Sequence, residues 1–173
     1  MKADSSSNPF GDLLLALARK DVQFIVAGGV AAVLHGVPRV TLDLDISICM
    51  EEANITRFLK LMKKLGLVPR APVPAETLID SVARQKIVRE KHAVVFTFLD
   101  PDDPLRHVDV FLTEELSYER LLEHTGVQML DRHRIRIVSA EYLLKLKKAI
   151  RPPREKDELD IRVLSKIVRD RSD

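Results

Sequence analysis

The segment from Thr41 to Ile48 constrains the fold more than any other, because apolar and polar residues alternate in it without exception. One face carries Leu42, Leu44, Ile46 and Ile48, and the other carries Asp43, Asp45 and Ser47. A period of two residues is typical of a β-strand that is buried on one face only. The chain is therefore expected to contain a sheet that holds two carboxylates on the face opposite its core.

Apolar runs, capping residues and turn residues predict the other elements. Strands are expected at 22–27, 94–99 and 105–112, and minor strands at 128–130 and 135–137. Helices are expected at 8–20, with Asn8 as N-cap, and at 52–65, with Gly66 as C-terminal cap. Further helices are expected at 30–34, 76–90, 118–123, 139–150, with Ser139 as N-cap, and 155–168. Residues 1–7 are expected to be disordered, and the turn-rich segment 100–104 favours a hairpin. This order predicts a mixed α/β fold, in which a small mixed β-sheet is flanked by helices and followed by a helical C-terminal region.

The distribution of charge divides the chain into two parts. Residues 1–131 carry 15 Lys and Arg against 19 Asp and Glu, whereas residues 132–173 carry 13 against 7. We interpret 1–131 as a catalytic domain and 132–173 as a basic helical region packed on it. The basic region either faces an anionic partner, such as a triphosphate or RNA, or is simply a solvated surface, and the sequence favours neither.

Composition excludes several classes of protein. No apolar run approaches the roughly 18 residues that a membrane span needs, and the first residues are polar rather than basic, unlike a signal peptide. The single cysteine, Cys49, excludes an intramolecular disulfide. The sequence therefore predicts a cytoplasmic protein that has no membrane partner.

The two aspartates of the alternating strand are the strongest candidates for a functional site. Side chains two residues apart on a strand stand about 6.5–7 Å apart, so Asp43 and Asp45 repel each other unless a cation lies between them. Asp109 supplies a third carboxylate in a strand whose other face is apolar, and a hairpin could bring it alongside. Three such carboxylates are suited to hold Mg²⁺ or Mn²⁺ ions. The alternative is that Asp109 is an ordinary surface residue.

The pair Gly28-Gly29 follows a buried strand and precedes a short helix. Its free backbone N–H groups could bind a phosphate, although the same pair could form an ordinary strand-to-helix turn. Arg39 and Thr41 lead into the acidic strand, where Arg39 could reach a phosphate or a carboxylate. His35 and His107 lack the spacing of metal ligands and are interpreted as structural.

The run from Phe24 to Ile46 resembles the signature of the DNA polymerase beta-like nucleotidyltransferase superfamily. It is most similar to a small bacterial and archaeal branch related to abortive-infection toxins. The matching residues are Gly28, Gly29, Gly36, Arg39, Thr41, Asp43 and Asp45, with Asp109 as the third carboxylate and Lys145, Lys147, Arg154, Lys156, Asp157 and Asp160 in a C-terminal lysine/aspartate segment. Many members of the superfamily have Gly-Ser where this chain has Gly28-Gly29.

The resemblance implies a metal-dependent nucleotidyltransferase. Asp43, Asp45 and Asp109 would hold Mg²⁺ or Mn²⁺, and Gly28, Gly29, Arg39, Thr41, Lys147 and Lys156 would bind a nucleoside triphosphate. The acceptor could be RNA, a protein or a small molecule, and the chain could be a toxin with an antitoxin protein as its partner. One alternative is an inactive binding module, which the position of Asp109 relative to the other two aspartates would distinguish. A metal-dependent glycosyltransferase is a third interpretation, but the enzymes of that class have larger folds than a chain of this length suggests.

Overall fold

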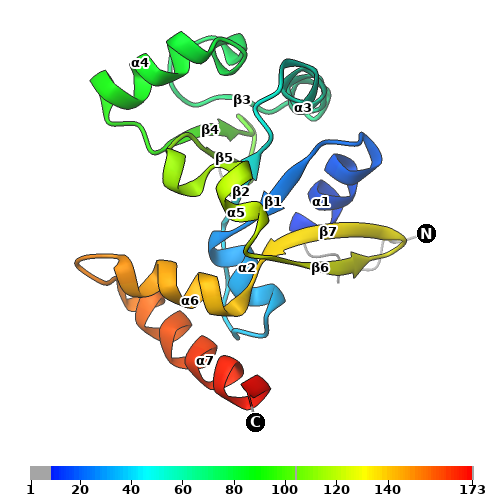
Figure 1. Ribbon diagram of the computed structural model, residues 1–173. Coiled ribbons are helices and arrows are strands. Elements are labelled where there is room, and N and C mark those ends of the chain that lie inside the picture. Colours follow the sequence, from blue (N-terminus) through cyan, green and yellow to red (C-terminus); the bar gives the residue numbers. More distant parts are fainter. Residues whose placement is uncertain (1–8, 104, 173) are drawn as a thin grey trace.

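The computed structural model describes residues 9–103 and 105–172 (Figure 1). The helices are α1 (Pro9–Arg19), α2 (Gly28–Leu34), α3 (Glu52–Lys64), α4 (Ser81–Lys91), α5 (Tyr118–Leu122), α6 (Ala140–Ala149) and α7 (Glu155–Ser172), with 3₁₀ turns η1 (Ala75–Leu78) and η2 (Glu114–Leu116). The strands are β1 (Phe24–Val26), β2 (Asp43–Ile48), β3 (Val68–Pro69), β4 (Val95–Leu99), β5 (His107–Phe111), β6 (Thr125–Leu130) and β7 (His133–Val138). The expected mixed α/β fold is confirmed.

All seven strands form one mixed sheet in the order β3-β4-β5-β2-β1-β7-β6. The pairs β2–β5 and β1–β7 are parallel, and the other pairs, including the expected β4–β5 hairpin, are antiparallel. The two strands expected to be minor, β6 and β7, form a regular hairpin that joins the sheet through β1. The acidic strand β2 therefore lies in the middle of the sheet, where neighbours on both sides fix its register.

The core lies on the apolar face of this sheet. Leu44, Ile46 and Ile48 of β2 are fully buried there, and Phe98 of β4 packs edge-to-face on Phe58 of α3, with ring centroids 5.4 Å apart. Burying aromatic and branched apolar side chains is the main favourable contribution to folding, and it fixes which face of β2 points inward. Leu42 departs from the expectation, since it precedes β2 and is 49% exposed.

The segment expected as one helix at 76–90 is instead two elements. The 3₁₀ turn η1 ends at Leu78, and α4 begins at Ser81 after Asp80, whose carboxylate accepts hydrogen bonds from the N–H groups of Val82 and Ala83. An aspartate that caps a new helix competes with continuation of the previous one. The expected disorder of residues 1–7 and the cap at Asn8 lie outside the described residues.

The two C-terminal helices pack against each other and lie below the sheet in the view of Figure 1, opposite α3 and α4. The hydroxyl of Ser139 accepts a hydrogen bond from the N–H of Tyr142 and caps α6, as expected. The expected boundary at 131/132 falls in the turn between β6 and β7. Because both strands belong to the sheet, the helical part of the C-terminal region begins only at α6.

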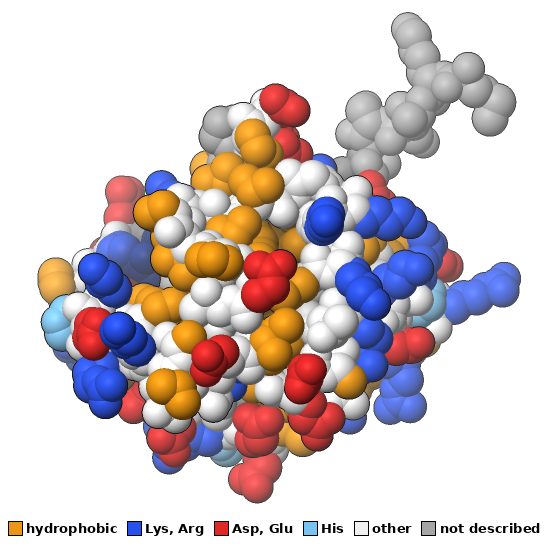
Figure 2. All heavy atoms as spheres, turned by 90° about the horizontal axis from the view of Figure 1, so that it is seen from above, with side chains coloured by type: hydrophobic (Ala, Val, Ile, Leu, Met, Phe, Trp, Pro, Cys, Tyr) orange, Lys and Arg blue, Asp and Glu red, His pale blue; other side chains and the backbone are white. Residues whose placement is uncertain are grey.

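The face that carries α3 and α4 shows hydrophobic side chains across its middle and Lys and Arg toward both sides (Figure 2). Helix α4 lies over this end of the sheet and buries none of its side chains fully. Within residues 9–103 and 105–172, no helix combines the length and the apolar character that crossing a bilayer requires.

Candidate active site

The register between β2 and β5 brings the three predicted carboxylates together. In this parallel pair Asp45 lies directly opposite Asp109, and Asp43 lies directly opposite His107. All four residues are on the face of the sheet opposite the core, because their neighbours Leu44 and Val108 are fully buried. The sequence suggested that a hairpin would align them, but the contact is made by two parallel strands far apart in the chain.

Two threonine hydroxyls support the carboxylates. The hydroxyl of Thr41 donates to Oδ1 of Asp43 at 3.1 Å, and the hydroxyl of Thr97 on β4 donates to Oδ1 of Asp109 at 2.5 Å. Such hydrogen bonds fix the orientation of carboxylates that bind metal ions. Thr41, expected at the nucleotide, thus contacts a carboxylate, and Thr97 is a supporting residue that the sequence analysis did not identify.

Crowding changes the acidity of Asp45. Burial, together with the negative charges of Asp43 and Asp109, raises the pKa of Asp45 to about 6, although the N–H of Gly29 and the charge of Lys147 act in the opposite direction. A carboxyl with this pKa is partly neutral near pH 6 and is ionised more easily when a cation is bound. The shift fits a site built for a positive ion.

The raised pKa predicts a measurable effect of pH on stability. The folded chain holds a proton on Asp45 that the unfolded chain has lost between pH 4 and 6, so the metal-free protein is destabilised as the pH rises through that range. A shift of this size corresponds to about 2 to 3 kcal/mol. We expect Asp45→Asn to remove this loss, as measured by urea midpoints from pH 4 to 7 in a chelator. The exposed Asp102→Asn control should follow the wild type, and parallel curves for all three proteins would contradict the assignment.

The glycine pair allows the acidic strand to approach α2 closely. Gly28 has φ +56°, and a Cβ atom at this position would lie 1.9 Å from Oδ2 of Asp45. A Cβ atom at Gly29 would lie 2.5 Å from the hydroxyl oxygen of Thr41 and 2.6 Å from Nη2 of Arg39. Glycine is therefore required here by the chain's own packing, whether or not a phosphate binds.

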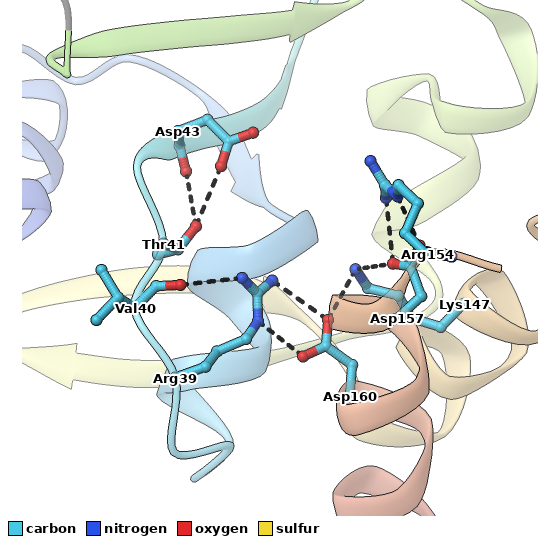
Figure 3. Close-up of polar contacts among 8 residues, drawn as sticks. All are labelled: Arg39, Val40, Thr41, Asp43, Lys147, Arg154, Asp157 and Asp160. Atoms are coloured by element: carbon cyan, nitrogen blue, oxygen red, sulfur yellow. Dashed lines mark hydrogen bonds and ion pairs between the residues drawn. The ribbon is translucent and has the colours of Figure 1, made fainter.

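A buried cluster of charges connects α6 and α7 to the loop before β2 (Figure 3). Nε and Nη2 of Arg39 donate to the two oxygens of Asp160 at 2.7 and 3.2 Å. Nζ of Lys147 lies 3.0 Å from Asp157 and 2.9 Å from Asp160, and both aspartate side chains are fully buried. The third guanidinium nitrogen of Arg39 donates to the carbonyl of Val40 at 3.2 Å. Each guanidinium nitrogen of Arg39 thus has a partner within the protein. Lys147 is paired internally as well, so part of the C-terminal positive charge does not face solvent.

Arg154 is the cation that this cluster presents to solvent. Its Nε and Nη2 contact Asp157 at 2.6 and 3.1 Å, yet 56% of its side chain is exposed. The hydrogen bond with Asp157, and more weakly the charges of Asp43 and Asp45, raise the pKa of Arg154. In the sequence Arg154 belongs to the lysine/aspartate segment, but it is not among the predicted site residues. The spacing of Arg154 and Asp157, three residues apart at the start of a helix, was the available signal.

A cavity of about 360 Å³ lies between the acidic strand and α6. Its polar lining includes Gly28, Gly29, Arg39, Asp43, Asp45, Lys147, Arg154 and Lys156, and its apolar lining includes Val94, Phe111 and Leu116. Most of the residues that the sequence analysis predicted to bind metal or nucleotide therefore line one cavity. Thr41 and Asp109 are not part of its wall.

His107, interpreted from the sequence as structural, lies beside the carboxylates in the folded chain. Ligand atoms of Asp43, His107 and Asp109 all lie within 4.8 Å of one another, which is close enough to hold one metal ion. Linear spacing could not reveal this arrangement, because His107 meets Asp43 only through the pairing of two distant strands. His35, in contrast, does have a structural role, since its Nε2 lies 2.7 Å from the carbonyl oxygen of Val138.

Comparisons with known proteins agree with this fold. No protein-family model and no curated protein matches the sequence. Among solved structures, the lincosamide antibiotic adenylyltransferase LnuA with bound lincomycin is similar, with a TM-score of 0.62 and 13% identity over 95% of this chain and 99% of that chain.

Two further structures are similar at a TM-score of 0.54. An antigenic nucleotidyltransferase-like protein from Paracoccidioides brasiliensis is 16% identical over 92% of this chain and 73% of its own. The antibiotic-resistance factor ANT(2'')-Ia is 14% identical over 95% of this chain and 91% of its own. At these identities the comparisons establish that the chain has a nucleotidyltransferase fold.

Proposed function

We propose that this chain is a metal-dependent nucleotidyltransferase, which moves a nucleoside monophosphate from a nucleoside triphosphate to an acceptor and releases pyrophosphate. The observation that carries the proposal is the position of Asp109, which lies opposite Asp45 and within reach of Asp43 on the open face of the sheet. An inactive binding module would have no need to keep three carboxylates together at the cost of their mutual repulsion.

The residues present fit divalent ions. Carboxylate oxygens are the ligands that Mg²⁺ and Mn²⁺ prefer, and hydroxyls already orient two of the three carboxylates. Asp43 and Asp45 would hold both ions, and Asp109 would complete the ion on the acceptor side. When bound, such ions favour attack by the acceptor hydroxyl and offset the charge of the leaving pyrophosphate.

The chain's own groups would orient the reactants. Asp109 would accept the proton of the acceptor hydroxyl. As that proton leaves, the hydroxyl oxygen of the acceptor would bond to the α-phosphorus, and the bond from the α-phosphorus to the pyrophosphate oxygen would break. Lys147, Arg154 and Lys156 on the cavity wall would face the triphosphate, and Gly28 and Gly29 would leave room for it. Catalysis of this kind is mainly positioning and charge stabilisation.

The test is transfer of label from each of the four α-labelled nucleoside triphosphates in the presence of Mg²⁺ or Mn²⁺. Small molecules form the first set of acceptors, because one similar structure is an adenylyltransferase with bound lincomycin. Pooled RNA and protein form the second and third. We expect label on one acceptor class together with an equal amount of pyrophosphate. The proposal would be refuted if the wild-type protein bound no nucleoside triphosphate in the presence of either Mg²⁺ or Mn²⁺.

The resemblance of residues 24–46 to the toxin-related branch supports a finer version of this proposal. In that version the acceptor is RNA, and an antitoxin protein restrains the enzyme. Label on the RNA fraction alone would support it, and label confined to small molecules would refute it.

A further inference from the structure

We propose that His107 is a nitrogen ligand of the ion on the acceptor side, and that it makes this position select a transition ion such as Mn²⁺ over Mg²⁺. The inference rests on the proposed function, since it concerns the same acidic site. It assigns a role to a side chain that the three-carboxylate arrangement leaves unused.

The geometry places His107 inside the site. It lies directly opposite Asp43 across the β2–β5 pair, and two residues before Asp109 on the same face of β5. A ring nitrogen of His107 and one oxygen from each of the two aspartates lie within 4.8 Å of one another. Three ligand atoms at such distances can surround one ion after small rotamer adjustments, and they come from rigid central strands rather than from loops.

The ligand atoms are also available. Thr41 and Thr97 donate to Oδ1 of Asp43 and Oδ1 of Asp109, which leaves Oδ2 of each carboxylate for an ion. Across residues 9–103 and 105–172, the His107 ring has no hydrogen-bond partner, whereas the His35 ring contacts Val138. An imidazole beside two oriented carboxylates, with both nitrogens uncommitted, is suited to accept a metal.

Asp45 is not among the three residues whose ligand atoms lie within 4.8 Å of one another. Its carboxylate accepts the N–H of Gly29 and lies against Gly28, toward the cavity of the nucleotide. An ion held by Asp43 and Asp45 on that side would have only oxygen ligands from the protein. The two ion positions therefore differ in their protein ligands. The position on the nucleotide side has only oxygen ligands, and the position on the acceptor side has both nitrogen and oxygen ligands.

This difference predicts selectivity. Mg²⁺ binds oxygen and gives up its water reluctantly, so a nitrogen ligand adds little to its affinity. Mn²⁺ has the lowest affinity for nitrogen ligands among the first-row transition ions, but an imidazole still adds more to its binding than to the binding of Mg²⁺. The acceptor-side position should therefore prefer Mn²⁺, while the nucleotide-side position accepts Mg²⁺.

The experiment uses the full chain and Mn²⁺ or Mg²⁺ alone, without nucleotide. Calorimetry should show that His107→Gln weakens Mn²⁺ binding by at least about tenfold, and Mg²⁺ binding by a smaller factor. Pulsed electron paramagnetic resonance of Mn²⁺ bound to the wild type should show coupling to a nitrogen nucleus, and this coupling should be lost in His107→Gln. The matched control is His133→Gln on β7, which should leave both readouts unchanged.

The outcomes separate the inference from the proposed function. No nitrogen coupling in the wild type would overturn the inference, even if nucleotidyl transfer is observed, and this result does not depend on whether the variant folds. Equal losses of Mn²⁺ and Mg²⁺ affinity in His107→Gln would also overturn it. Nitrogen coupling that depends on His107, in a protein that transfers no nucleotide, would support the metal ligand and leave only the proposed function refuted.

Discussion

Asp43→Asn, Asp45→Asn and Asp109→Asn are each expected to reduce nucleotidyl transfer by at least about a thousandfold, which corresponds to roughly 4 kcal/mol of transition-state stabilisation. Asparagine keeps the shape of aspartate but removes the charge that attracts the ions. Because the three carboxylates act as one unit, the double variant Asp43→Asn/Asp45→Asn should be little worse than either single variant. The measurement is the initial rate of pyrophosphate release with the acceptor that the labelling experiment identifies.

Folding stability provides the control for this series. Removing one of several crowded negative charges should leave the metal-free urea midpoint unchanged or higher, so activity and stability should change independently. Asp102→Asn, an exposed aspartate in the β4–β5 loop, should retain full activity. If Asp109→Asn kept wild-type activity while the two β2 variants lost theirs, the third carboxylate would have been assigned to the wrong strand.

Asp160→Asn is expected to destabilise the protein by about 3 to 5 kcal/mol, because it removes the partner of two buried cations. Asp160 is fully buried and contacts Arg39 and Lys147, which come from the loop before β2 and from α6. Its loss leaves the Arg39 guanidinium, only 10% exposed, without a carboxylate. Urea unfolding measures the effect, and Arg39→Gln combined with Asp160→Asn should cost less than the sum of the single variants.

The matched control is the less buried pair of Arg106 and Asp100, whose side chains are 38% and 17% exposed and whose atoms lie 3.1 Å apart. Exposed ion pairs contribute at most about 1 kcal/mol, so Arg106→Gln should change the urea midpoint only slightly. Equal small effects of Asp160→Asn and Arg106→Gln would show that the cluster does not fasten α7 to the sheet. Lost transfer with unchanged stability would instead indicate that Asp160 acts by positioning Lys147.

Much of the fold could be predicted from the sequence because its causes are local. Alternation in β2 reflects the two-residue period of a strand. The cap at Ser139 depends on a hydrogen bond to a residue three positions later, and the cap at Gly66 depends on the positive φ of that glycine. The prediction of one continuous helix at 76–90 was wrong for a local reason as well. Its apolar pattern continued past Asp80, but the hydrogen bonds of that side chain start a new helix there.

The alternation of residues alone places Asp43 and Asp45 on one face of a half-buried strand, since strand geometry allows no other arrangement. The residues that surround them depend on long-range packing. The parallel pairing of β2 with β5 brings in Asp109 and His107, and the packing of α7 engages Arg39 with Asp160, 121 residues away. Such contacts depend on how buried apolar faces set the register of distant segments. No local pattern of residues specifies that register, which is why the position of His107 beside Asp43 became visible only in the folded chain.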